Sequence, residues 1–204
     1  MTAAILGGTF NPVHIGHLVL AMEAREAFGY DRIILVPANL PVHKDTAPIV
    51  AGAHRLAMLR LAIEGCEGLL VDDGELVRGG PSWTVDTVVE LVPRYGITGR
   101  PGLVIGDDLA AGFSAWKDAE RLAGMVDLIL ARRTGERHGR FAWPHRTVMN
   151  PLISVSSSDL RRRVAEGRSI RFLTPDTVAA YIAANGLYTA GGAGPGREDP
   201  TADA

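Results

Sequence analysis

Two patterns of apolar residues alternate along the chain: short continuous runs, and longer runs with helical spacing. Continuous runs are typical of parallel strands, because both faces of such a strand are buried. They predict strands at Ala3–Leu6, Arg32–Val36, Leu69–Asp72, Leu103–Ile105, Val126–Ala131 and near Thr147–Met149. Helical spacing predicts helices at His17–Phe28, Ala53–Ile63, Thr84–Tyr95 and around Trp116–Ala123. The alternation predicts an α/β fold with an open, doubly wound parallel sheet, which binds ligands at the carboxyl ends of its strands.

Two further helices are predicted near the carboxyl end of the chain from their first residues. Ser156 is the expected N-cap of one, with Asp159 at the third helical position as in a capping box. Thr174 is the expected N-cap of the other, with Pro175 at the first helical position. The prolines within Ala38–Ala51 predict a long loop, and long loops of compact domains often carry function.

Length and composition predict one globular domain followed by a tail. A chain of 204 residues is closer to one domain than to two, and its 47% hydrophobic and 22% charged residues suit a packed core. We expect the domain over residues 1–188 and a disordered tail over residues 189–204, which are mainly Gly, Ala, Pro, Asp and Thr. The single cysteine, Cys66, and the lack of a membrane-spanning apolar run or signal peptide predict a cytoplasmic protein without disulfides.

The distribution of charge is more informative than its balance. The formal net charge is −2, which does not suggest nucleic acid as a partner. Between Arg121 and Arg171, however, 11 arginines stand against four acidic residues. This excess of positive charge suits a phosphate-rich ligand, and a solvated basic face is the alternative interpretation.

The first predicted strand continues into a segment rich in glycine and histidine, GGTFNPVHIGH at residues 7–17. Glycine lets backbone N–H groups approach an anion closely, and the following helix places the positive end of its dipole nearby. His14 and His17 are spaced to direct two imidazoles towards one anion across Gly16. We interpret the segment as a phosphate-binding site. The alternatives for the histidines alone are a helix-capping histidine in a tight turn and half of a metal site.

A second candidate for phosphate binding is the helix start that Ser156 caps. Residues Ser156–Ser158 offer three hydroxyls, and Arg161 follows within one turn. Alone they form a capping box, but together with the first segment they would hold a polyphosphate between two helix N-termini. Asp107 and Asp108 follow the strand Leu103–Ile105, where carboxylates could hold a ribose or a hydrated Mg²⁺, or simply begin a helix.

These segments carry a resemblance to a known family. Residues 7–17 resemble the GGTFDPVHxGH signature of the nucleotidyltransferase superfamily, and residues 155–161 resemble its ISxTxIR signature. Over Ile5–Tyr188 the chain is similar to bacterial nicotinate-nucleotide adenylyltransferases. Further matches are PVHK at 41–44, PSWT at 81–84, GDD at 106–108, Trp116, Arg132-Arg133 and LTP…YI…GLY at 173–188. The departures are Asn11 for Asp, Val42 for Pro, Trp83 for Tyr and Ser158 for Thr, the last of which keeps the hydroxyl.

The resemblance implies a Rossmann-like nucleotidyltransferase fold and a site for two substrates, ATP and nicotinate mononucleotide. The implied catalytic residues are His14, His17, Lys44 and Arg161. The implied ATP-binding residues are Gly7, Gly8, Thr9, Phe10, His14, Gly16, His17, Gly106, Asp108, Ser156, Ser157, Ser158 and Arg161. The implied mononucleotide-binding residues are Thr9, Asn11, Lys44, Ser82, Trp83, Thr84, Asp107, Trp116 and Arg133.

The implied reaction transfers the adenylyl group of ATP to nicotinate mononucleotide, giving nicotinate adenine dinucleotide and pyrophosphate in NAD biosynthesis. The acceptor's own phosphate would attack, and it is already ionised at neutral pH, so no protein nucleophile is needed. In agreement, the sequence has neither a G-x-S-x-G elbow nor a P-loop motif. Mg²⁺ is expected to arrive with ATP, with no separate protein metal site and no nucleic-acid or membrane partner. A homo-oligomer is compatible with the sequence, which sets no subunit number.

Two alternative functions remain open from the sequence. Within the superfamily, the acceptor could instead be nicotinamide mononucleotide or phosphopantetheine, or the enzyme could be a cytidylyltransferase. A tRNA-binding module is an alternative of another class, because HIGH at residues 14–17 is also a motif of class I aminoacyl-tRNA synthetases. The chain is short for such a protein and lacks a KMSKS-like lysine loop.

Overall fold

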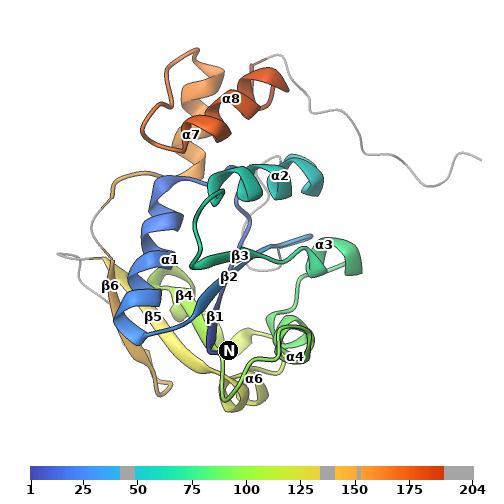
Figure 1. Ribbon diagram of the computed structural model, residues 1–204, viewed down its shortest axis with the longest axis vertical. Coiled ribbons are helices and arrows are strands. Elements are labelled where there is room, and N and C mark those ends of the chain that lie inside the picture. Colours follow the sequence, from blue (N-terminus) through green and yellow to red (C-terminus); the bar gives the residue numbers. More distant parts are fainter. Residues whose placement is uncertain (42–48, 134–140, 151–152, 191–204) are drawn as a thin grey trace, which may run out of the picture.

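The computed structural model describes residues 1–41, 49–133, 141–150 and 153–190, which form one parallel sheet with helices on both faces (Figure 1). The six strands lie in the order β3-β2-β1-β4-β5-β6, and every neighbouring pair is parallel. The strands are β1 (Ala3–Gly8), β2 (Arg32–Pro37), β3 (Leu69–Val71), β4 (Gly102–Gly106), β5 (Asp127–Arg133) and β6 (Arg146–Asn150). The predicted fold class is therefore confirmed, and each predicted strand is present.

The helices divide between the two faces of the sheet. They are α1 (Ile15–Phe28), α2 (Gly52–Ala62), α3 (Gly74–Arg78), α4 (Thr84–Arg94), α5 (Asp107–Ala110), α6 (Ala119–Met125), α7 (Ser157–Ala165) and α8 (Asp176–Ala184). Alternate residues of β1 point to opposite faces: Ala4 and Leu6 join a core with residues of α1, α2, α7 and α8, and Ala3 and Ile5 join a core with α4 and α6. Figure 1 shows α7 and α8 at one end of the molecule, beyond α1 and α2.

The order of the strands places the first sequence motif at the point where the sheet reverses direction. β1 pairs with β2 on one side and with β4 on the other, so the connections after β1 and after β4 leave on opposite sides of the sheet. A crevice for ligands forms at such a point, outside the carboxyl ends of the strands. Gly7 and Gly8 end β1, and Gly106 ends β4. The predicted phosphate-binding segment therefore begins where this fold binds ligands.

Two predictions of local structure were wrong. Thr174 is not an N-cap: the cap is Pro175, and the Thr174 hydroxyl instead donates to the carbonyl oxygen of Val13 at 2.9 Å. Trp116 precedes α6 rather than lying in it, because the chain first makes a 3₁₀ turn over Phe113–Ala115. The short helix α3 was not predicted, and α5 appeared only in the alternative interpretation of Asp107 and Asp108 as a helix start.

Most of the predicted tail, residues 191–204, lies outside the described residues. The same is true of residues 42–48, which include Lys44 and half of the loop predicted between β2 and α2. Within the part of the chain that the structure describes, no helix is both long and apolar enough to cross a membrane.

Candidate active site

The two histidines of the glycine-rich segment stack on each other at the start of α1. His14 is the N-cap, with extended backbone, and is 8% exposed. Its backbone N–H donates to Nδ1 of His17 at 3.2 Å, and the ring centroids lie 3.7 Å apart at an interplanar angle of 23°. Because Nδ1 of His17 is the acceptor, neutral His17 carries its proton on Nε2. The capping and phosphate-binding interpretations are therefore compatible, since the cap orients Nε2–H as a donor.

Gly16 lets α1 pack closely against the residues beside it. A Cβ atom at this position would lie 3.1 Å from the His14 ring and 3.2 Å from Cγ1 of Val155, the residue two before α7. Those distances are shorter than ordinary van der Waals contact. The φ angle of Gly16 is not positive, so its backbone conformation does not require glycine. The close approach of His14 and Val155 is therefore the reason for glycine at this position.

Replacing Gly16 with alanine is expected to lower kcat by about tenfold, because a shift of the His14 ring moves it from its productive position. Gly124→Ala in α6 is the matched control, because a Cβ atom there meets nothing within 4 Å. We expect this control to keep wild-type kcat. Steady-state kinetics on both variants check the prediction, and an unchanged kcat for Gly16→Ala would contradict it.

Carbonyl oxygens of the segment between β1 and α1 accept hydrogen bonds from side chains of distant elements. Each engaged oxygen turns its lone pairs towards a protein donor, which reduces the repulsion that carbonyl groups would exert on a phosphate. The donors are Arg55 for Thr9 (2.9 Å), Arg161 for Asn11 (2.7 Å), Ser157 for Pro12 (2.8 Å) and Thr174 for Val13 (2.9 Å).

Asn11 faces the protein interior. It is 3% exposed and precedes a cis peptide bond to Pro12, and its Oδ1 accepts from the Tyr188 hydroxyl at 2.9 Å. Burial raises the pKa of Tyr188, opposed by the charges of Arg161 and Arg55, so the hydroxyl stays a donor at neutral pH. Asn11 thus helps to shape the segment, and its contact with a mononucleotide stays a prediction.

The start of α7 lies against this segment, so the structure brings the two sequence motifs together. Ser156 is the N-cap as predicted, and its Oγ accepts from the N–H of Asp159 at 3.1 Å. Ser157 donates to Pro12, as described above, and Oγ of Ser158 lies 3.1 Å from Nη2 of Arg161. The N-termini of α1 and α7 therefore meet beside residues 7–17, as a polyphosphate site requires.

The consecutive arginines of α7 point in different directions. Arg161 is half-buried and reaches the carbonyl of Asn11. Arg162 pairs with Asp159 at 2.6 Å on the surface, and Nε of Arg163 donates to the carbonyl oxygen of Ser169 at 2.8 Å. Only Arg161 therefore faces the glycine-rich segment.

Arg161→Ala is expected to lower kcat/KM for ATP by about 10- to 100-fold, the range for losing a hydrogen bond to a charged group. Arg162→Ala and Arg163→Ala are the matched controls and should change kcat/KM less than about threefold. Kinetics with varied ATP measure all three. Equal losses would indicate a diffuse basic surface rather than a specific contact.

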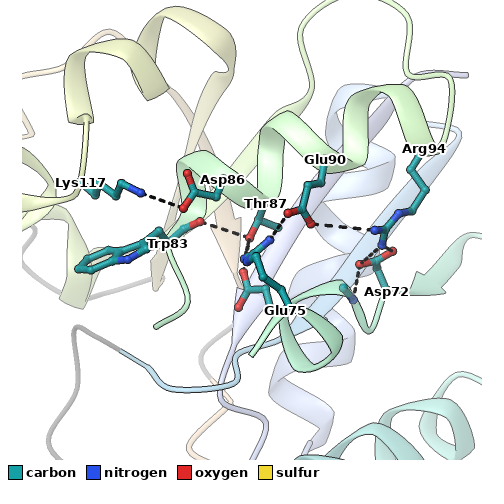
Figure 2. A network of polar contacts seen from close by, with 10 residues as sticks. Asp72, Glu75, Trp83, Asp86, Thr87, Glu90, Arg94 and Lys117 are labelled. Carbon is teal, nitrogen blue, oxygen red and sulfur yellow. Dashed lines mark hydrogen bonds and ion pairs between the residues drawn. The ribbon is translucent and has the colours of Figure 1, made fainter. Parts of the chain in front are cut away.

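Three of the predicted acceptor-binding residues, Ser82, Trp83 and Thr84, lie at the start of α4. Trp83 is its N-cap and Thr84 its first residue. The N–H of Asp86 donates to the carbonyl oxygen of Trp83 at 3.1 Å, so Thr84 and Val85 carry the first-turn N–H groups that have no acceptor within the helix. Nζ of Lys117 lies 5.7 Å from the centroid of the Trp83 ring and 2.9 Å from Oδ2 of Asp86 (Figure 2). Trp83 and Trp116 are both partly buried against the core that α4 and α6 share. Trp116 also packs on Phe113, with ring centroids 5.1 Å apart.

A network of polar side chains supports α4 from the direction of α3 (Figure 2). Thr87 is 3% exposed, and its hydroxyl contacts the buried carboxylate of Glu75 and the carbonyl oxygen of Trp83. At the far end of α4, Asp72 pairs with Arg94 at 2.8 Å and accepts from the Tyr95 hydroxyl at 2.9 Å. Burial, and next the hydrogen bond to Asp72, raise the pKa of Tyr95 to about 12. The network thus holds α4, and with it the N-cap Trp83, in place.

The acidic pair begins α5, and the strand before it ends at Gly106. A Cβ atom at Gly106 would overlap the carboxylate of Asp108, so a larger residue there would displace the Asp108 side chain. Oδ1 of Asp107 lies 3.8 Å from Nε of Arg132. Lys44 and the side chain of Arg133 fall outside the described residues. Among those described, no group of three metal-ligating side chains occurs, so the metal-site alternative for the two histidines has no third ligand there.

Sequence reasoning missed three residues that shape the site: Arg55, Thr174 and Tyr188. Thr174 and Tyr188 were part of the family resemblance but were given no role in the site. Arg55 was not singled out, although helical spacing places it on the same face as the apolar Met58 and Ala62. An arginine on the buried face of a helix is the signal that could have found it.

Comparisons with known proteins agree with this geometry. The cytidylyltransferase-like family model matches residues 5–163. The "probable nicotinate-nucleotide adenylyltransferase" of Borrelia garinii subsp. bavariensis is 39% identical over 188 residues, covering 92% of this chain and 95% of the relative. The protein of the same name from Marinobacter nauticus is 36% identical over 208 residues, covering 91% and 96%.

A solved structure supports the fold independently. The nicotinic acid mononucleotide adenylyltransferase of Plasmodium falciparum, complexed with NaAD, superposes with a TM-score of 0.72 at 17% identity, covering 92% of this chain and 97% of that one. At 17% identity this structural similarity supports the fold alone. The bacterial relatives, in contrast, match the sequence over nearly the whole domain. The chain therefore belongs to the cytidylyltransferase-like family and, within it, to the nicotinate-nucleotide adenylyltransferases.

Proposed function

We propose that the protein transfers the adenylyl group of ATP to nicotinate mononucleotide, forming nicotinate adenine dinucleotide and pyrophosphate in NAD biosynthesis. The observation that carries the proposal is the meeting of two helix N-termini, at His14 and at Ser156, beside the glycine-rich end of β1. The relatives that share this sequence are named for the same reaction.

The protein's contribution to this reaction is position and charge. The phosphate of the mononucleotide attacks the α-phosphorus of ATP, and pyrophosphate leaves, so no protein group forms a covalent bond. We assign the Nε2–H of His17 and the imidazole of His14 to the phosphates whose charge changes in the transition state. We assign Arg161 and residues Ser156–Ser158 to the outgoing pyrophosphate, because they line the second helix start. The hydroxyls of Ser156 and Ser157 already donate to Asp159 and to the carbonyl oxygen of Pro12, so among the three hydroxyls we assign the donor role to Ser158, which accepts from Arg161.

ATP enters this proposal as its Mg²⁺ complex. The described residues offer no cluster of three metal ligands, which suits an ion held mainly by phosphate oxygens and water. Asp107 and Asp108, at the carboxyl end of β4, are the acids placed to contact such a hydrated ion or a ribose. When bound, the ion would neutralise charge on the phosphates.

The acceptor is assigned to the start of α4, with Trp83 and Trp116 as the flat partners of its pyridine ring. The first-turn N–H groups of α4 provide donors for the nicotinate carboxylate. A cytoplasmic location belongs to the same proposal, since both substrates are metabolites of that compartment.

Pyrophosphate release from ATP across a panel of acceptors tests the proposal. Nicotinate mononucleotide is expected to give the highest kcat/KM, above nicotinamide mononucleotide and phosphopantetheine. A filter-binding assay with tRNA tests the alternative that the protein is a tRNA-binding module. We expect the filter-bound protein to retain no tRNA. Release with phosphopantetheine alone would refute the assigned acceptor, and tRNA binding without pyrophosphate release would refute the enzyme assignment.

A further inference from the structure

Arg55 is a buried cation that lies between the two halves of the site. It is 2% exposed and lies on α2 beside the buried Met58, Leu59 and Ala62. Its guanidinium donates to three carbonyl oxygens: Nη1 to Thr9 at 2.9 Å and to Ala38 at 2.6 Å, and Nε to Val50 at 3.1 Å. A buried charge is costly unless its hydrogen bonds are made, and these bonds satisfy that requirement.

The three acceptors belong to two connections of the fold, one between β1 and α1 and one between β2 and α2. Thr9 follows β1 in the phosphate-binding segment, Ala38 follows β2, and Val50 precedes α2. β1 and β2 are neighbours, with Gly8 opposite Pro37, and the N–H of Ala38 donates to the carbonyl oxygen of Gly8 at 2.9 Å. One guanidinium therefore joins the two segments of the chain directly after their last paired residues.

The residues just after Ala38 are hydrogen-bonded to the residues that precede α4. The N–H of Asn39 donates to Oγ of Ser82 at 2.8 Å, and the N–H of Ser82 donates to the carbonyl oxygen of Leu40 at 3.0 Å. Nδ2 of Asn39 also donates to the carbonyl oxygen of Gly80 at 3.0 Å. Hydrogen bonds thus connect Thr9, through Arg55 and residues 38–40, to Ser82 beside Trp83.

Arginine suits this place better than lysine. Its planar group presents several donors in fixed directions and stays charged, whereas an ammonium is a single compact charge. Burial lowers the pKa of Arg55, while Tyr188 and Glu75 act in the opposite direction, so the group is still a cation at neutral pH. That charge also lies behind the segment assigned to the phosphates of ATP.

We propose that Arg55 is a positioning residue, which fixes the phosphate-binding segment at Thr9 relative to the acceptor-binding residues at Ser82 and Trp83. The inference rests on the proposed function, because it concerns the alignment of two substrates. In-line transfer depends on that alignment. Its loss should therefore lower the rate of transfer more than it weakens the binding of either substrate alone.

The test compares Arg55→Met and Arg55→Lys with two controls on the same helix. Met58→Ala removes a fully buried side chain from the core and should lower Tm without changing kcat at temperatures where it is folded. Arg60→Gln removes an exposed cation that pairs with Asp73 and should leave Tm and kcat unchanged. kcat comes from pyrophosphate release, and the Kd values for ATP and for nicotinate mononucleotide come from separate calorimetric titrations.

Arg55→Met is expected to lose about 100-fold in kcat while each Kd changes less than about fivefold, and Arg55→Lys should recover part of kcat. A folded Arg55→Met variant with wild-type kcat would overturn the inference while leaving the proposed function intact. If Arg55→Met does not fold, Arg55→Lys decides: a lowered kcat supports positioning, and wild-type kcat assigns Arg55 to stability alone. A wild-type protein that releases no pyrophosphate would overturn the proposed function, and this inference with it.

Discussion

Replacing His17 with alanine is expected to lower kcat by about 10²–10³-fold, the loss typical of removing one donor to transition-state charge. The structure gives the reason: Nδ1 accepts the His14 N–H, which leaves Nε2–H as the group that donates. The same substitution removes one helix-capping bond, worth about 1 kcal/mol, so Tm should fall by only a few degrees. Kinetics and a thermal melt on the same preparation measure both effects.

His17→Asn separates the two roles of the imidazole. Its side-chain oxygen can accept from the His14 N–H as Nδ1 does, but the side chain has no counterpart of Nε2. We expect Tm close to the wild-type value and kcat as low as in His17→Ala. His54→Ala, which removes a histidine that contacts Tyr181 on α8, is the control and should keep full activity. A His17→Asn variant with wild-type kcat would refute the assigned donor.

Nicotinate mononucleotide should be preferred over nicotinamide mononucleotide by about 10²-fold in kcat/KM. A carboxylate pairs with the donors at the start of α4, whereas the amide of nicotinamide brings an NH₂ group against them and leaves donors unpaired. Comparing the two acceptors at saturating ATP gives the ratio. Equal values, or a preference for nicotinamide, would refute this placement of the pyridine ring and leave adenylyl transfer itself standing.

Lys117→Gln distinguishes the two possible origins of this preference. The Lys117 ammonium lies near Trp83, but it is paired with Asp86 at 2.9 Å, which offsets its charge. We therefore expect the variant to keep most of the preference for nicotinate, which assigns the preference to the backbone N–H groups. A ratio that falls to near one would assign it to the lysine.

The fold was predictable because each strand can be recognised from a short stretch of its own sequence. Runs such as Ile33–Val36 are apolar throughout, as is typical of strands buried on both faces, and the sheet followed from their alternation with helices. Short helices give no such signal. The five residues of α3 include Gly74 and contribute few core contacts, so their conformation depends on anchors such as Asp72, which accepts from the Gly74 N–H at 2.8 Å.

The candidate site was predictable where it is built from residues that are adjacent in the sequence, as in GGTFNPVHIGH and in the Ser156 cap. It was not predictable where the same residue type could serve two partners. The Thr174 hydroxyl was expected at a helix N-terminus but donates to Val13, because a buried carbonyl elsewhere in the chain competes for it. The contacts of Arg55 depend likewise on two connections, after β1 and after β2, that meet only in the folded protein.

The donors behind the glycine-rich segment also determine when the site can form during synthesis. The segment ends at residue 17, but the residues that hold Pro12, Asn11 and Val13 lie 145, 150 and 161 positions further along the chain, and Tyr188 lies 177 positions beyond Asn11. A nascent chain therefore exposes the motif long before the groups that shape it leave the ribosome. Nucleotide binding should thus arise as a late event of folding, and stalled or clipped chains that lack α7 and α8 would carry the motif without the site.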